Sequence, residues 1–259
     1  MKGGQEILDQ LFDATRSVQA LPALVPEALD VSTGYALQRQ ALEQRLARGE
    51  QLSGWKIAFA GSAAQARFGL DEPAYGSLTD AMSVEPGNPV SLPRLIQPKL
   101  EIELAFVFGR SLPAGHCRDE DILAAIGEVA PAFEIADCRW QQWRFGAGAF
   151  LADNAAAGLY SLGQRVAFDA LRHACVAYRL ECDGVLCGVG DTLDREDSPL
   201  RNLCWLVRRL LADGQRVEAG QVVLSGSLLA PLDVQPATYR LHMLGTELAL
   251  VFVAEPAPA

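Results

Sequence analysis

The sequence predicts an α+β protein built on a sheet or a β-sandwich, with its helices early in the chain and most strands late. Apolar residues recur at helical spacing in the first fifty positions, whereas strand patterns dominate the second half. The regular strand and helix alternation of a doubly wound fold is missing. We expect one compact unit with a helical N-terminal portion (1–80) and a β-rich catalytic core (81–259).

The N-terminal portion carries signals for three helices and one strand. Amphipathic patterns predict helices from Glu6 to about Ala20 and from Thr33 to about Leu46. The apolar run Trp55 to Ala60 predicts a strand that contains Lys56. A capping box at Ser62 to Gln65 then predicts a helix that ends near Gly69.

The middle of the chain predicts loops followed by a strand, a helix and a further extended segment. Five prolines between Asp71 and Pro98 favour loops and short extended pieces. Leu100 to Phe108 is typical of a strand, Arg118 to Glu128 of a helix, and Ala132 to Ile135 of extended chain.

The last third predicts a hairpin, a helix and three strands. Asp183-Gly184 is a typical two-residue turn between the strand patterns at 177–181 and 185–187. Ser198 and Pro199 are suited to the N-terminus of a helix that runs to about Leu211. The remaining strands are expected at 221–224, 239–243 and 247–253.

Composition excludes several classes of function. The formal net charge of −10 and the absence of a basic run argue against nucleic-acid binding. There is neither a signal-like start nor a run of about 18 apolar residues, so we expect a cytoplasmic protein that does not bind a membrane. The six cysteines form no CxxC pair and are expected to be free thiols.

Three glutamates are candidates for a metal site. Because strand side chains alternate between faces, Glu101 and Glu103 lie on the same side of their strand, and Glu134 sits in another apolar segment. Three carboxylates without histidine form a hard-oxygen site, which suits Mg²⁺ or Mn²⁺. The alternative is that the first two glutamates lie on the solvent face of an antiparallel strand and the third lies elsewhere.

At these residues the sequence resembles the 2-keto-4-pentenoate hydratase and 4-oxalocrotonate decarboxylase group of the fumarylacetoacetate hydrolase superfamily. The resemblance covers nearly the whole chain, and the matching motifs occur in the family's order. They are Gly54-Trp-Lys56-Ile, Tyr75-Gly-Ser-Leu78, Pro98-Lys-Leu-Glu101-Ile-Glu103-Leu-Ala, Pro131-Ala-Phe-Glu134-Ile, Ala152-Asp-Asn154-Ala and Leu224-Ser-Gly-Ser227.

The resemblance implies a mixed β-sandwich roll with a helical N-terminal portion, assembly into homo-oligomers, and Mg²⁺ or Mn²⁺ at the three glutamates. A small 2-oxo acid would bind through its 1-carboxylate and 2-oxo oxygens. Lys56 matches the family's active-site lysine, which helps proton transfer or holds the substrate carboxylate. Asp153 and Asn154 are expected to orient the metal or the substrate, with turn residues as the alternative. Ser225 and Ser227 are expected near the substrate carboxylate, with a polar strand end as the alternative.

The chain departs from the family pattern at the substrate end. Ala155 and Ala156 follow Asn154 where many relatives have Ala-Ser, so a hydroxyl group is missing. Phe59-Ala-Gly-Ser62 replaces the usual Gly-Leu-Thr-Ser. These departures leave the metal motif intact, so the resemblance constrains the metal more closely than the substrate.

The resemblance implies a lyase that adds water to a 2-hydroxy-2,4-dienoate and gives a 4-hydroxy-2-oxo acid. The first alternative is decarboxylation of a 2-oxo-dicarboxylate. The second is a catalytically weak partner subunit or binding protein.

Overall fold

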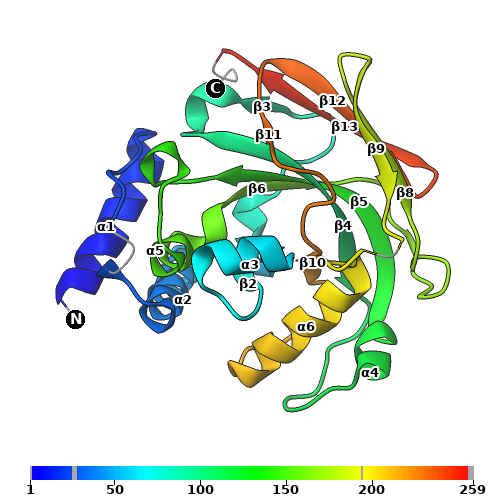
Figure 1. Ribbon diagram of the computed structural model, residues 1–259, viewed down its shortest axis with the longest axis horizontal. Coiled ribbons are helices and arrows are strands. Elements are labelled where there is room, and N and C mark those ends of the chain that lie inside the picture. Colours follow the sequence, from blue (N-terminus) through cyan, green and yellow to red (C-terminus); the bar gives the residue numbers. More distant parts are fainter. Residues whose placement is uncertain (1, 25–27, 194, 256–259) are drawn as a thin grey trace.

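The computed structural model describes residues 2–24, 28–193 and 195–255, and it contains two β-sheets with helices around the larger one (Figure 1). The helices are α1 (Lys2–Ser17), α2 (Val31–Ala47), α3 (Ser62–Phe68), α4 (Asp119–Leu123), α5 (Ala147–Ala152) and α6 (Pro199–Ala212). None of the helices described is both long and apolar enough to cross a bilayer.

The large sheet contains the residues that later form the site. Its main strands lie in the order β2 (Ala74–Thr79), β1 (Leu52–Ala58), β10 (Val222–Leu224), β4 (Pro98–Phe108), β5 (Ile126–Asp137) and β6 (Ala157–Leu162). Two short strands, β7 (Val166–Ala167) and β11 (Leu232–Asp233), pair with β5 and β4. β10 is parallel to β1 and antiparallel to β4, so a late strand joins two early parts of the sheet.

The small sheet lies against one face of the large sheet. Its order is β3 (Pro89–Ser91), β13 (Thr246–Val253), β12 (Ala237–Met243), β8 (Ala177–Cys182) and β9 (Val185–Asp191). Ile102 and Leu104 of β4 belong to the same buried cluster as Leu241 and Leu250 of the small sheet and Leu206 of α6. Burial of these alternating apolar side chains holds the two layers together.

The helices α1, α2 and α5 pack beside the large sheet in a second apolar cluster. Leu8 of α1, Leu37 of α2, Phe150 of α5 and the buried Trp140 all belong to this cluster. The side chain of Asp30 accepts a hydrogen bond from the backbone N–H of Thr33 and so caps α2. These contacts fix the segment that leads into and out of α5, which lies next to the site.

The mixed fold of two sheets with an early helical portion confirms the predicted fold class. The late helix with its Ser198 cap, the hairpin and the last strands also lie where they were predicted. Strands β1 and β2 precede residue 80 but belong to the large sheet, so the two predicted portions share one sheet. The boundary between these portions stays a prediction.

Two local predictions were wrong. The helix predicted over 118–128 is only five residues long, because Ile126 and Val129 pair with β4 as the start of β5. The helix at Ser62 lacks its capping box, since Gly61 is the N-cap and the side chain of Gln65 donates to the carbonyls of Phe59 and Ala60. By contrast, the proline-rich segment 71–98 contains the short strands β2 and β3 between loops, as predicted, and β2 lies at the edge of the large sheet.

Candidate metal centre

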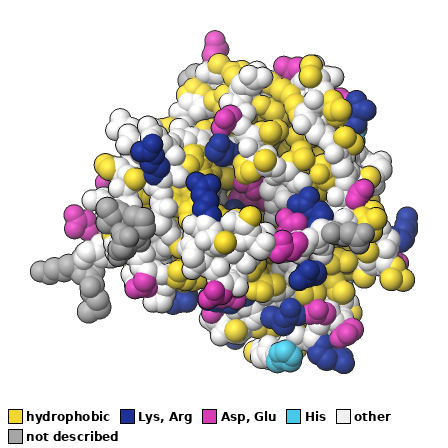
Figure 2. Space-filling model, viewed as in Figure 1, with side chains coloured by type: hydrophobic (Ala, Val, Ile, Leu, Met, Phe, Trp, Pro, Cys, Tyr) yellow, Lys and Arg dark blue, Asp and Glu magenta, His cyan; other side chains and the backbone are white. Residues whose placement is uncertain are grey.

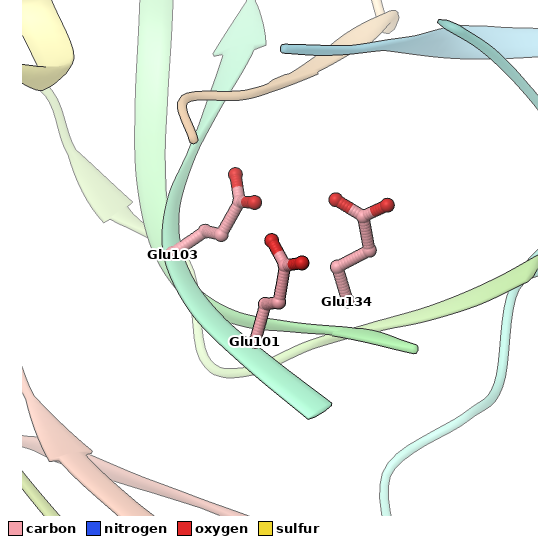
Figure 3. Close-up of side chains that lie close together, drawn as sticks. All are labelled: Glu101, Glu103 and Glu134. Atoms are coloured by element: carbon pink, nitrogen blue, oxygen red, sulfur yellow. The ribbon is translucent and has the colours of Figure 1, made fainter. Parts of the chain in front are cut away.

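The three glutamates meet on one face of the large sheet. Glu101 of β4 is directly opposite Glu134 of β5, and Glu103 lies two residues further along β4 on the same face. Figure 3 shows the three side chains pointing toward a shared space. One carboxylate oxygen from each lies within 4.8 Å of the others.

The carboxylates of this cluster have too few donors around them. Glu103 and Glu134 are fully buried, and the backbone N–H of Gly226 donates to Glu103 Oε2 at 2.6 Å. Among the described residues, Glu103 Oε1 and Glu134 Oε2 have no hydrogen-bond donor, and Glu134 Oε1 has only the ammonium group of Lys56 beside it. Because buried acceptors without partners are costly, this donor set fits a cation that would coordinate the free oxygens.

Lys56 lies on the same face and contacts the cluster. It pairs in register with Leu224 of β10, and Leu224 pairs with Ala105 of β4, so all three share the face of the glutamates. Lys56 Nζ lies 2.8 Å from Glu134 Oε1 and donates a hydrogen bond to the carbonyl of Ala155 at 3.2 Å. The ammonium group of Lys56 balances the charge of one of the three carboxylates, so an excess of negative charge remains.

The pKa values of the cluster reflect this excess. Burial, together with the charge of Glu134, raises the pKa of Glu101 to about 7. The same causes raise the pKa of Glu103 well above its ordinary value. Burial alone would lower the pKa of Lys56, but the neighbouring carboxylates outweigh it and raise that pKa. The site therefore attracts positive charge, either as protons or as a metal ion.

The turn after α5 is held by two polar contacts. Asp153 forms a buried ion pair with Arg139, whose guanidinium also donates to the carbonyls of Asp137 and Ala157. Burial raises the pKa of Asp153 to about 6, although the charge of Arg139 lowers it. Asn154 Oδ1 accepts from the backbone N–H of Ser77 at 2.8 Å, and Asn154 Nδ2 donates to the carbonyl of Ser77 at 2.9 Å.

These contacts impose an unusual backbone on the turn. Asn154, Ala155 and Ala156 have φ angles of 52°, 53° and 56°, a run in the left-handed region that non-glycine residues avoid. A Cβ on Gly76 of β2 would lie 2.5 Å from the carbonyl oxygen of Asn154, so the strand and the turn require a glycine there. The result is that the carbonyl of Ala155 faces Lys56.

A cavity of about 440 Å³ opens onto this centre. It is lined by Lys56, Glu101 and Ser227 and by a group of aromatic side chains. The space-filling view shows a hollow with acidic side chains inside it and lysine or arginine side chains around its rim (Figure 2).

The four residues that were predicted to contact the substrate lie in three different environments. Ser227 lines the cavity, and its hydroxyl donates to the carbonyl of Leu229 at 2.7 Å. Ser225 is fully buried, and its hydroxyl has no partner among the described residues. Asp153 and Asn154 line a different hollow, so they act on the cavity only through the residues that they hold.

Several residues of the site had no clear signal in the sequence. Arg139 and Ser77 take part through long-range contacts that no local pattern specifies. Ala155 takes part through its backbone carbonyl, which accepts from Lys56, so its side chain gives no signal. The cavity's aromatic residues come from separate segments, and only the richness of 140–150 in Trp and Phe could have pointed to some of them.

The sequence profile of the fumarylacetoacetate (FAA) hydrolase C-terminal family matches residues 54–241. The chain belongs to this family. Within the FAA hydrolase family it is 36% identical over 241 residues to the 2-hydroxyhexa-2,4-dienoate hydratase of Comamonas testosteroni, covering 91% of this chain and 90% of the relative. It is also 34% identical to a 2-keto-4-pentenoate hydratase of Burkholderia vietnamiensis, covering 83% of each.

A solved structure supports the fold. The 4-oxalocrotonate decarboxylase from Pseudomonas putida G7, complexed with magnesium and adipate, superposes with a TM-score of 0.90 at 24% identity. The match covers 97% of this chain and 98% of the decarboxylase. The family and the fold that were expected from the sequence motifs are thereby confirmed.

Proposed function

We propose that this chain is a divalent-metal-dependent lyase that adds water to a 2-hydroxy-2,4-dienoate and gives a 4-hydroxy-2-oxo acid. The convergence of three carboxylates and a lysine at a cavity that opens to the surface carries the proposal. The hydratase names of the relatives at 34% and 36% identity support the reaction.

The cation in this proposal is Mg²⁺ or Mn²⁺, held by Glu101, Glu103 and Glu134. Carboxylate oxygens are the ligands that both ions prefer, and the buried oxygens without donors are suited to coordinate them. When bound, the cation supplies a Lewis acid that stabilises negative charge developing on the 2-oxygen of the substrate.

Lys56 is the proposed catalytic residue. Its Nζ faces the cavity, and its raised pKa keeps it protonated at neutral pH. It can therefore deliver the proton that interconverts the dienol and 2-oxo forms, or hold the substrate carboxylate by its charge. The carbonyl of Ala155 fixes the direction of the ammonium group.

The other predicted residues receive different roles. Ser227 lines the cavity, and we assign it to the substrate carboxylate. Ser225 lies next to Gly226, whose N–H binds Glu103, and we assign it to the support of that loop through its backbone, since its carbonyl accepts a hydrogen bond from Asn202 Nδ2 at 2.8 Å. Asp153 and Asn154 act as positioning residues that hold the turn behind Lys56.

The test is turnover by the purified protein with Mg²⁺ or Mn²⁺. Loss of dienol absorbance with 2-hydroxypenta-2,4-dienoate and formation of the 4-hydroxy-2-oxo acid are expected, and chelation of the metal should abolish both. Metal binding without turnover of this dienoate or of its alkyl-substituted homologues would instead favour a binding protein or a partner subunit.

Decarboxylation of a 2-oxo-dicarboxylate is the second candidate, because one positively charged side chain in the cavity is free to bind the carboxylate at the far end of such a substrate. Arg67 lines the cavity, and no described residue forms an ion pair with it. Release of CO₂ from 2-oxohex-3-enedioate, lost in Arg67→Gln, would establish this reaction in place of hydration.

We further propose a cytoplasmic homo-oligomer. All six cysteines are free, as is usual in a reducing compartment. Val185, Leu186 and Val189 on the edge strand β9 are 68%, 51% and 67% exposed. An exposed apolar edge strand is suited to pair with a second copy of the chain, which would cover these side chains.

A further inference from the structure

One side of the cavity is a continuous layer of aromatic rings, which we call the aromatic wall. It consists of Phe59, Phe68, Trp143, Phe145 and Phe150. Ring centroids are 4.5 Å apart for Phe59 and Phe68, 4.5 Å for Phe59 and Phe150, and 4.8 Å for Phe145 and Phe150. The ring centroids of Phe68 and Phe145 are 5.3 Å apart, and that of Trp143 lies 6.4 Å from that of Phe145.

The wall is built from three separate parts of the chain. Phe59 follows the last residue of β1 and lies three positions after Lys56, Phe68 ends α3, and the others lie in or just before α5. The rings pack against one another, yet all of them border the space that Lys56 and Glu101 also border. The cavity therefore has one charged end and one apolar side.

The positive charges around the cavity offer at most a weak second carboxylate site, through Arg67 alone. Lys56 is paired with Glu134, and Lys99 Nζ lies 2.7 Å from Asp233 Oδ1. Arg67 is exposed, and its guanidinium lies 5.4 Å from the centroid of Phe68. An exposed and flexible arginine gains little from a single carboxylate, whereas five rings offer a large apolar surface.

From this arrangement we propose that the aromatic wall is a subsite for an apolar tail at the end of the substrate remote from its 1-carboxylate. The inference rests on the proposed function and narrows its substrate class. The substrate is a 2-hydroxydienoate that carries an alkyl chain or an aryl group beyond the dienoate carbons. The volume of about 440 Å³ lies in the range of cavities that hold drug-sized ligands, which exceed a five-carbon acid.

Binding of saturated 2-oxo acids tests the subsite without requiring turnover. Isothermal titration calorimetry with Mg²⁺ would compare pyruvate, 2-oxobutanoate, 2-oxohexanoate and 2-oxooctanoate. Each methylene that reaches the wall should tighten binding about fourfold, the factor that corresponds to ~0.8 kcal/mol per buried CH₂. Three methylenes separate 2-oxohexanoate from pyruvate, so its affinity should be higher by up to roughly 60-fold.

A matched ligand pair separates an apolar tail from a second carboxylate. 2-Oxohexanoate and 2-oxohexanedioate have the same chain length and differ only in a methyl or a carboxylate at the far end. We expect the monocarboxylate to bind more tightly. Equal or tighter binding of the dicarboxylate, or no gain with chain length, would overturn the inference while leaving metal-dependent binding intact.

Variants connect the effect to the wall. Phe145→Ala should flatten the dependence of affinity on chain length, because it removes the ring that contacts three other wall residues. The control is Phe12→Ala, since Phe12 is a half-buried phenylalanine of α1 that lines another hollow, and it should keep the full dependence. An unchanged slope in Phe145→Ala would refute the assignment. If no 2-oxo acid of any length binds to the wild-type protein, the proposed function itself fails.

Discussion

Replacing Glu103 by glutamine should stabilise the metal-free protein and remove its response to metal. Oxygens of the three glutamates lie within 4.8 Å of one another. At an effective dielectric constant of about 20, two unit charges at that separation repel by about 3 kcal/mol. Glutamine keeps an oxygen that can accept the hydrogen bond from Gly226, so the substitution removes charge with little change of shape.

The stability gained by Glu103→Gln should depend on pH, because protonation of the glutamates relieves the same repulsion between their charges. The pKa of Glu103 is raised in the folded state, so its contribution to the free energy of unfolding is present below about pH 4.5 and is lost as the pH rises. Glu103→Gln should therefore differ little from the wild type at pH 5. At pH 8 we expect it to be more stable by about 1–3 kcal/mol, which raises Tm by roughly 3–10 °C in a chain of this size.

Thermal unfolding by circular dichroism at both pH values, with and without Mg²⁺ or Mn²⁺, measures these effects. The wild type should gain stability with added metal by mass action, whereas Glu103→Gln should gain little. Glu128→Gln is the matched control, since Glu128 lies on the neighbouring strand with its side chain 46% exposed and should change stability by less than about 0.5 kcal/mol. A metal-free Glu103→Gln protein that is less stable than the wild type at pH 8 would refute the reasoning.

Three further outcomes are expected. Lys56→Met should lower turnover by about 100-fold or more while the metal still raises Tm, and turnover within threefold of the wild type would remove Lys56 from the mechanism. Metal affinity measured by calorimetry should increase as the pH is raised toward 7, by about tenfold or more per pH unit, because the cation competes with the proton of Glu101, whose pKa is about 7, and with that of Glu103, whose pKa is also raised. A flat profile would contradict that competition. Val189→Lys should reduce the molar mass found by light scattering, and an unchanged mass would exclude β9 as the interface.

The sequence was sufficient to predict the acids of the candidate site, but not the way they meet. Alternation along β4 places Glu101 and Glu103 on one face, and this rule needs only local sequence. The pairing of Glu101 with Glu134 depends on the register between two strands, which nothing in either segment alone determines. The family resemblance supplied that link.

Predictions from local pattern were wrong where tertiary contacts outweigh it. Residues 126–128 continued a helical pattern, but pairing with β4 makes them strand. The aromatic wall could not be predicted because its rings come from the end of β1, from α3 and from the region of α5, which only the complete fold brings together.

The position of β10 has a consequence for how the protein is made. This three-residue strand lies between β1 and β4, so without it no strand pairing links β1 and β2 to the glutamate strands. While residue 222 is still inside the ribosome, β10 cannot form. The nascent chain then cannot bring Lys56 beside Glu134. Most of the polypeptide must be synthesised before the sheet closes, and a chain cut just before β10 should be unable to assemble the centre.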